Sequence, residues 1–381
     1  MNSDFSVPLD RLVPIFVRGF SPYFADKPDA ELMKFYGCSR LLRLNNNENP
    51  LGPPLAARHA LEEFSSRGAA IYPNADSFDL RHRLSEVFWL PPDQFLVGSG
   101  ANEILGFVIR SFCQSGDNIV TADRTFSAYE SVARFSGIEA RLTPLKDFEF
   151  DEKALLAAID EKTKLIFICN PNNPTGTWWS KERLYAFMDR IAGRRIVVLD
   201  EAYAEFVERS EFPDGMKLID QYPNLLVFRT FSKMYGLAGL RIGYIVGSRE
   251  VVEIVRRASF ASSINTPAQI TASLALGDPA HIFQTREMVR IGKEYLLREF
   301  RRMGLNPIGE EGNFLMIRVP MNDALVFRKL MLKGIMVRTM TGFRFPNHIR
   351  ISIGELPAMQ ALVEALEGIL WKNANAEQPL P

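Results

Sequence analysis

The chain has 381 residues, with 45 basic and 45 acidic side chains, so its formal net charge is zero. This balance excludes proteins that hold nucleic acid or a membrane surface by bulk charge. Three scattered cysteines and four histidines lack the spacing of a disulfide framework or a metal site, so we expect neither. The first residues lack a signal-peptide pattern and no apolar run is long enough to span a membrane, so we expect a cytoplasmic protein.

The first part of the chain, residues 1–49, is rich in proline and asparagine and predicts an extended arm that contributes to a smaller domain. From about residue 95, short apolar runs alternate with amphipathic stretches. The runs predicted as strands lie within residues 95–101, 118–123, 164–170, 195–203, 224–231 and 241–248. This alternation predicts an α/β domain at residues 50–265, with a mostly parallel sheet flanked by helices.

The pattern changes after residue 265. The predicted elements are a long charged helix at about 278–303, strands within 313–320, 335–340 and 348–354, and helices at about 322–333 and 356–371. Together they predict a small C-terminal α+β domain at residues 266–372. Residues 373–381 form a polar tail.

Several polar residues directly follow the predicted strands. They are Asn173 in the turn PNNPTG, Asp200 and Tyr203 after IVVL, and Ser232 and Lys233 after LLVFRTF. Because ligands bind beyond the carboxyl ends of parallel strands, we expect these side chains to share one crevice. Each has a simpler interpretation by itself: a tight turn, a helix N-cap for the aspartate, or a surface loop for the lysine. Their occurrence together, at successive strand ends, favours the shared crevice.

The lysine and its neighbours fit a bound aldehyde and a bound phosphate. A partly desolvated Lys233 would have a lowered pKa and would act as an amine nucleophile toward an aldehyde. Arg241 and Ser232 would bind a phosphate. The backbone amides near Ala101 and Asn102, which follow glycines at a predicted helix start, would assist them. The sequence has no GxxxxGK[ST] motif, which argues against a P-loop nucleotide enzyme.

The other polar residues of the crevice fit an aromatic ring. Asp200 would pair with a protonated ring nitrogen, and Phe126 in DRTFSAY would stack on the ring face. Tyr203 and Asn173 would hydrogen-bond a ring hydroxyl. An aldehyde, a phosphate, a pyridine nitrogen and a phenolic oxygen together describe pyridoxal 5'-phosphate. A lysine Schiff base and an aspartate on the ring nitrogen are the expected protein contributions to that cofactor.

The motifs NNPTG, DEAYAEF, TFSK and GLRIGY carry a resemblance. In this order they resemble the class I/II PLP-dependent aminotransferases of fold type I. Over about residues 20–370 the chain is most similar to the histidinol-phosphate aminotransferases of that family. The similarity rests on the stretches SPYFADKP, LNNNENPLGPP, IYPNADSFDLRHRL, GIMVRTM and FPNHIRISIG.

The resemblance implies further site residues and a homodimer whose subunits share their active sites. Arg350 would bind the substrate carboxylate, or occupy the matching place when the substrate has none. Arg338 would contact the substrate phosphate, and Tyr23 and Asn49 would contact the substrate. Tyr72 would reach the cofactor phosphate of the partner subunit.

The resemblance also implies a ping-pong reaction in which Lys233 moves the α-proton of the amino donor and 2-oxoglutarate accepts the amino group. The chain departs from the family pattern at Thr339, Phe343 and Arg344, the last of which adds a cation near the expected substrate. Transamination of an aromatic or other amino acid therefore stays open, as does decarboxylation of a phosphorylated amino acid. A cofactor-binding module without turnover is a third alternative.

Overall fold

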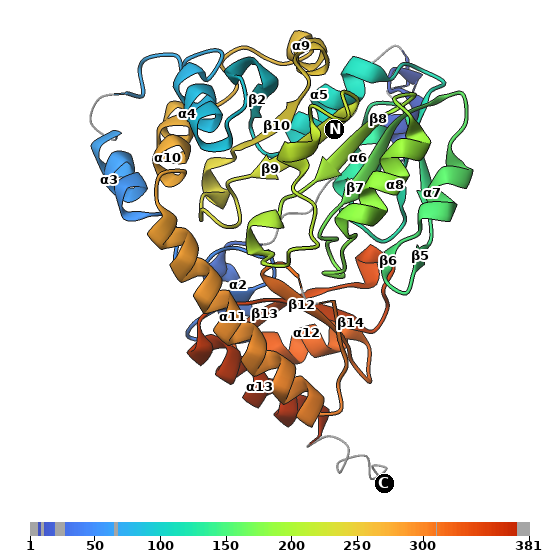
Figure 1. The fold of residues 1–381 in the computed structure, drawn as a ribbon. Helices are drawn as coiled ribbons and strands as arrows, with labels where there is room; N and C mark the ends of the chain where they lie inside the picture. Colours follow the sequence, from blue (N-terminus) through green and yellow to red (C-terminus); the bar gives the residue numbers. More distant parts are fainter. Residues whose placement is uncertain (1–6, 9–10, 20–26, 65–67, 310, 372–381) are drawn as a thin grey trace.

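The computed structural model of the chain describes residues 7–8, 11–19, 27–64, 68–309 and 311–371. Figure 1 shows a large sheet in the upper half of the molecule and a smaller sheet in the lower half. The long helix α11 (Pro279–Arg302) runs from the upper part to the lower part along one side. The strand ends that carry the predicted site face the region between the two sheets.

The large sheet has seven strands, and most of its neighbours are parallel. In spatial order they are β2 (Phe95–Gly98), β10 (Gly243–Gly247), β9 (Leu225–Thr230), β8 (Ile196–Asp200), β7 (Thr163–Cys169), β3 (Asn118–Ala122) and β4 (Glu139–Thr143). Strand β10 is antiparallel to both of its neighbours, and the pairs from β9 to β4 are parallel. The central strands are almost completely buried, as expected for a parallel sheet covered on both faces.

The helices of this part of the described chain lie around the sheet or pack on the helices that cover it. They are α3 (Leu55–Phe64), α4 (Phe78–Phe88), α5 (Ala101–Phe112), α6 (Ala128–Phe135), α7 (Glu152–Ala158), α8 (Lys181–Ile191), α9 (Arg249–Arg257) and α10 (Thr266–Ala275). Short 3-10 turns occur at η2 (Pro92–Gln94), η3 (Ala204–Phe206), η4 (Gly215–Leu218) and η5 (Ala238–Leu240), and a hairpin joins β5 (Leu145–Lys146) to β6 (Glu149–Phe150). All six strands predicted for this region are confirmed, which supports the α/β assignment.

The smaller sheet has five strands, mostly antiparallel. In spatial order they are β1 (Leu42–Leu44), β13 (Ile335–Thr339), β14 (His348–Ser352), β12 (Phe314–Arg318) and β11 (Pro307–Ile308). The helices of this part are α2 (Asp29–Tyr36), α12 (Asp323–Met331) and α13 (Leu356–Leu370), with a 3-10 turn at η6 (Thr341–Phe343). The amino-terminal strand β1 pairs in parallel with β13, so residues far apart in sequence complete one sheet.

Capping side chains mark where several of the helices begin. The side chain of Asn265 accepts from the amide of Ala268 at the start of α10. Asp278 does the same for α11, whose first residue is a proline. Asn322 accepts from two amides at the start of α12. Asn and Asp at the N-cap satisfy amides that lack partners within the helix, and proline needs no such partner in the first turn.

The prediction of an irregular amino-terminal arm was wrong for residues 29–36. They form helix α2, which has Asp29 and Glu31 in its first turn and ends at Gly37 with a left-handed backbone. Acidic residues at a helix start and glycine at its end stabilise a helix. The proline and asparagine content of the flanking residues obscured this signal. The short helix α1 (Ile15–Arg18) contacts α6 beside the large sheet.

The domain bounds stay a prediction, and two helices bear on them. Helix α10 packs against α3 and α4, which belong to the large-sheet side, although it follows the expected boundary at residue 265. Helix α11 packs against α13 on the small-sheet side. Among the residues that the structure describes, no helix has both the length and the apolar character needed to cross a membrane.

Candidate active site

The predicted strand-end residues do converge. In the parallel pair of β7 and β8, Cys169 is the register partner of Asp200, so the turn after β7 lies beside the start of the turn after β8. Strand β9 follows β8 in the sheet and leads into Ser232 and Lys233. The antiparallel pairing of Gly98 with Gly243 brings the glycine turn before α5 to the same edge.

Lys233 lies half-buried between the two sheets. Its Nζ donates a hydrogen bond to the backbone oxygen of Asn46, at 2.8 Å, and lies 6.0 Å from the centre of the Tyr203 ring. Burial, together with the positive charges of Arg350 and Arg241, lowers the pKa of the Lys233 amine to about 7, although the charge of Glu48 opposes this shift. A large fraction of the amine is therefore neutral near neutral pH, as a nucleophile toward an aldehyde requires.

Asp200 is the carboxylate at the end of β8, and its side chain is held from two sides. It accepts a hydrogen bond from the hydroxyl of Tyr129 and another from the amide of Ala202, at 3.0 Å. Only 3% of the residue is exposed, and burial raises the pKa of its carboxyl to about 6, against the lowering effect of these hydrogen bonds. A buried carboxylate of this kind is stabilised by a cationic partner.

Tyr203 lies three residues after Asp200 and is also buried. Its Oη accepts a hydrogen bond from Nδ2 of Asn47, at 2.9 Å, and its ring meets that of Phe314 edge to face at 5.0 Å. Burial raises the pKa of its hydroxyl to about 12, so the phenol stays protonated at neutral pH. Lys233 and Tyr203 thus lie close together as predicted.

A cradle for an anion forms where α5 begins. Gly100 precedes the helix with a φ of 79°, and no side chain caps the first turn. A Cβ on Gly100 would lie 2.4 Å from Nη2 of Arg241, so only glycine lets this guanidinium approach the helix start. Arg241 itself has a left-handed backbone with a φ of 55°. The amides of Ala101 and Asn102 and the Arg241 guanidinium are positioned to bind a phosphate.

Two arginines lie side by side on the smaller sheet. Arg338 in β13 and Arg350 in β14 are direct cross-strand partners. Arg350 is buried and donates to Oδ1 of Asn173 and to the backbone oxygen of Asn45, the latter at 2.8 Å. Burial and the charge of Arg338 lower the pKa of Arg350 to about 10, against an opposing effect of Tyr203. Like charges directly opposite each other are unfavourable unless an anion lies between them.

Buried polar atoms around Arg350 lack partners within the described chain. They are Nε of Arg350, Oδ1 of Asn313, and both amide atoms of Asn45. Buried polar groups are normally hydrogen-bonded, and a buried cluster of exceptions indicates a ligand or ordered water. The unpaired guanidinium nitrogen points to an anion as that ligand.

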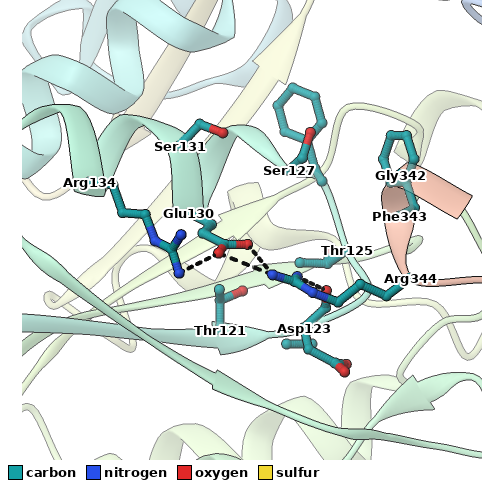
Figure 2. A pocket seen from close by; sticks show the side chains of 12 residues that line it. Thr121, Asp123, Thr125, Ser127, Glu130, Ser131, Arg134, Gly342, Phe343 and Arg344 are labelled. Atoms are coloured by element: carbon teal, nitrogen blue, oxygen red, sulfur yellow. Dashed lines mark hydrogen bonds and ion pairs between the residues drawn. The ribbon is translucent and has the colours of Figure 1, made fainter. Parts of the chain in front are cut away.

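A cavity of about 270 Å³ lies between α6 and η6. Figure 2 shows the side chains that line it. Phe126 lines it, and its ring also meets that of Tyr129 edge to face at 5.5 Å. Arg344 extends across it and donates to the backbone oxygen of Asp123, at 2.6 Å, and to the carboxylate of Glu130, at 2.9 Å. The positive charge of Arg344, which was expected near the substrate, is therefore paired with the carboxylate of Glu130 in α6.

Comparison with known proteins identifies the family. Residues 39–366 match the family of class I and II aminotransferases. The chain belongs to this family. It is 37% identical to a protein of Caldicellulosiruptor saccharolyticus named histidinol-phosphate aminotransferase, over 93% of this chain and 99% of the relative. It is 38% identical to a Pseudomonas fluorescens protein named histidinol-phosphate aminotransferase 2, over 94% of this chain and 97% of the relative.

Solved structures agree with this assignment. The histidinol-phosphate aminotransferase of Sinorhizobium meliloti, solved in complex with pyridoxal 5'-phosphate, matches 95% of this chain and 98% of its own, with a TM-score of 0.85 and 25% identity. An aspartate aminotransferase of Thermus thermophilus shares the fold, with a TM-score of 0.81 at 21% identity. The chain is a PLP-dependent aminotransferase of fold type I, and both the predicted fold class and the predicted cofactor are confirmed.

The residues present fit pyridoxal phosphate. The cradle that a Cβ at Gly100 would fill suits the cofactor phosphate. A neutral amine at Lys233 suits its aldehyde, and a buried carboxylate at Asp200 suits a protonated ring nitrogen. Ser232, which is buried beside Lys233, lies at the expected strand end. The assignment of each residue to a part of the cofactor stays a prediction.

Three further predicted residues lie apart from this cluster or outside the described chain. Asn49 is buried, and its Nδ2 donates to the backbone oxygen of Met234 and to the hydroxyl of Thr285. Both N–H groups of that amide are thus engaged within the chain. Tyr72 is 89% exposed on the surface. Tyr23 lies outside the described residues. Among the described residues, no group of three metal-ligating side chains occurs.

Sequence reasoning missed two side chains that hold the site. Tyr129 donates to Asp200, and Asn47 donates to Tyr203. Tyr129 lies three residues after Phe126, on the next turn of the chain, and that spacing was the available signal. Asn47 gave no comparable signal, since its partner is 156 residues away.

Proposed function

We propose that this aminotransferase moves the amino group of histidinol phosphate to 2-oxoglutarate, as a step of histidine biosynthesis. The observation that carries the proposal is the pair Arg338 and Arg350, which lie opposite each other with one buried guanidinium nitrogen unpaired. Histidinol phosphate has an amine and a phosphate but no carboxylate. A phosphate with nearly two negative charges matches two adjacent guanidinium groups. The names of the relatives also support this donor.

The same arginine pair suits the second half of the reaction. The acceptor 2-oxoglutarate carries two carboxylates and no phosphate. Arginine binds a carboxylate with two parallel hydrogen bonds, and Arg350 has its Nε available for one of them. One anion subsite can therefore serve the donor phosphate and an acceptor carboxylate in turn, as a ping-pong reaction requires.

Lys233 would move the proton of the reaction. With its pKa lowered to about 7, its amine can accept the proton from the donor carbon and return it on the other side of the transfer. When bound, pyridoxal phosphate supplies an electron-withdrawing ring that stabilises negative charge on that carbon. Asp200 would hold the ring nitrogen protonated, and Tyr203 and Asn173 would hydrogen-bond the ring oxygen. Phe126 would cover one ring face.

We further propose a homodimer in which each subunit completes the site of the other. Tyr72 and the neighbouring Ile71 are 89% and 74% exposed, and these two adjacent large side chains support the proposal because contiguous exposed apolar surface marks interaction sites. Tyr72 would reach the partner's cofactor phosphate. Tyr23 and Asn49 are proposed near the substrate. The three free cysteines are consistent with a reducing compartment, and we propose the cytoplasm.

A screen of amino donors tests the function. The cofactor-loaded protein receives histidinol phosphate, phenylalanine, tyrosine or phosphothreonine, each alone, and the loss of its visible absorbance is followed while products are identified. Histidinol phosphate should convert the cofactor fastest and yield the oxo product. Faster conversion by phenylalanine or tyrosine would reassign the donor to the aromatic amino acids. Release of carbon dioxide from phosphothreonine would indicate a decarboxylase.

A further inference from the structure

Residues 45–47 follow β1 and form hydrogen bonds with three side chains of the site. The backbone oxygen of Asn46 accepts from Lys233, and that of Asn45 accepts from Arg350. Asn47 differs from both because it uses its side chain, whose Nδ2 donates to Tyr203. This side chain is fully buried, and its contacts reach β14 of the small sheet and the turn that follows β8 of the large sheet.

A chain of hydrogen bonds sets the direction of the Asn47 amide. The hydroxyl of Ser352 accepts from the backbone N–H of Asn47, at 2.7 Å, so its own hydrogen is free to donate. It donates to Oδ1 of Asn47, at 3.2 Å. No other described residue accepts from this hydroxyl. A flipped amide would leave the Ser352 proton without an acceptor, so Oδ1 faces Ser352 and Nδ2 faces Tyr203.

The direction of the amide determines what Tyr203 can do. Its oxygen accepts the Asn47 N–H, and no described residue accepts the hydrogen of its own hydroxyl. A phenol whose oxygen is already engaged as an acceptor directs its hydrogen elsewhere. Because Tyr203 lies beside Lys233, that hydrogen is available to a ligand bound there.

We propose that Asn47 is a positioning residue, which holds the Tyr203 hydroxyl so that it donates to the ring oxygen of the cofactor. The inference rests on the proposed role of Tyr203 and is independent of which amino donor the enzyme uses. In this arrangement Ser352 donates to Asn47, Asn47 donates to Tyr203, and Tyr203 donates to the cofactor. Each member donates one hydrogen forward, so the arrangement is ready before the cofactor binds.

The backbone explains why asparagine suits this position. Asn47 has a φ of 55°, in the left-handed region that asparagine and glycine tolerate better than other residues. Its backbone oxygen also accepts from Nδ2 of Asn313, at 3.0 Å. Glycine at position 47 would keep this backbone and remove only the side-chain hydrogen bonds. Asn47→Gly is therefore the sharpest variant.

The experiment is a double-mutant cycle with Asn47→Gly, Tyr203→Phe and both together. For each, we would measure the affinity of the cofactor-free protein for pyridoxal phosphate and the pH midpoint of the visible absorbance of the loaded protein. No amino donor is present, so a wrong donor assignment does not affect the result. Loss of a donor to the ring oxygen leaves more negative charge there, so the midpoint should move upward in both single variants.

The cycle has a definite expectation. Asn47→Gly should weaken cofactor binding about tenfold, the effect of one buried hydrogen bond, and should add no more than about twofold in the Tyr203→Phe background. Independent effects that multiply in the double variant would overturn the proposal. No effect of Asn47→Gly beside a full effect of Tyr203→Phe would overturn the inference alone. No effect of Tyr203→Phe would overturn the proposed role of Tyr203 as well.

A second variant guards against a folding defect. Ser352→Ala keeps the asparagine and removes the hydroxyl that sets its direction, so it should move the absorbance midpoint in the same direction by a smaller amount. Thermal unfolding of each cofactor-free variant would show whether the fold is retained. If Asn47→Gly does not fold, an unchanged midpoint in a folded Ser352→Ala variant would itself contradict the proposal.

Discussion

The two ends of the active site differ in how their polar groups are satisfied. At the ring end, Asp200 and Tyr203 already have hydrogen-bond partners, Tyr129 and Asn47, before any ligand is bound. At the anion end, Arg350 has an unpaired buried nitrogen, and Arg338 lies directly opposite with the same charge. The side chains of the first end are therefore held in place by the chain itself, whereas the second end contains a buried cationic nitrogen without a partner among the described residues.

This difference matches what each end must bind. The ring end holds one cofactor in one orientation, so fixed donors and acceptors lower the cost of reorganisation. The anion end must accept two different substrates in alternate half-reactions. Unpaired buried charge is costly, and the gain on binding an anion is correspondingly large. The unpaired buried cationic nitrogen of Arg350 therefore lies where the exchanging substrates are proposed to bind.

Removal of the Lys233 amine, which would act in both half-reactions, should have the largest effect. Lys233→Ala should lower transamination by about 10⁴-fold or more, because no other described amine lies at that place to move the proton. Turnover with histidinol phosphate and the thermal unfolding midpoint would be measured together. A folded variant with near-normal turnover would remove Lys233 from the mechanism.

The pH dependence of cofactor uptake tests the environment of the same lysine. Only the neutral amine attacks an aldehyde, and the pKa of Lys233 is lowered to about 7. The rate at which the cofactor-free protein takes up pyridoxal phosphate should rise about tenfold per pH unit below pH 7 and level off above it. Stopped-flow absorbance would follow the uptake. A rate that keeps rising to pH 10 would indicate an ordinary, solvated lysine.

A change at the phosphate cradle beside Gly100 should weaken cofactor binding and leave the anion end unchanged. Gly100→Ala would place a Cβ 2.4 Å from Nη2 of Arg241 and would force a side chain into a left-handed backbone. Cofactor affinity should fall about tenfold or more, while the order of preference among amino donors stays the same. Equilibrium titration with pyridoxal phosphate measures the first, and the donor screen measures the second. A changed donor order would show that the two ends are coupled.

The smallest effect is expected at Arg344, which lies at neither end. Its backbone has a φ of 62°, so Arg344→Gly relieves about 1 kcal/mol of strain. The lost ion pair with Glu130 is half-exposed and contributes about the same or less. The midpoint of thermal unfolding and the half-reaction rate should both change little. A large loss of rate with histidinol phosphate would instead place Arg344 at the substrate.

The sequence alone predicted those site residues whose position is set by the end of one strand. Asp200 and Lys233 were predicted because each directly follows an apolar run, and the sheet edge then fixes where they lie. The partners Tyr129 and Asn47 were not predicted, because their roles depend on contacts across 71 and 156 residues of sequence. Helix α2 was missed because its capping signals are short and lie between proline-rich stretches.

The pairing of Arg338 with Arg350 shows the same limit. Both arginines were named through the family resemblance, but the sequence alone does not give the register of β13 and β14 that makes them neighbours. Nor does it show that one guanidinium nitrogen stays unpaired when the chain is folded. The register of two strands and the hydrogen-bond partners of buried polar atoms depend on how the chain packs, so they could be found only in the structure.

The most direct test of the anion end compares histidinol phosphate with histidinol, which lacks only the phosphate. Rates of the donor half-reaction would be measured for the wild-type protein and for Arg338→Gln, which removes one charge and keeps a polar side chain. The account predicts that the wild type prefers histidinol phosphate by at least about 100-fold and that Arg338→Gln reduces this preference about tenfold or more, with little change for histidinol. Equal losses for both donors, or no preference in the wild type, would contradict it.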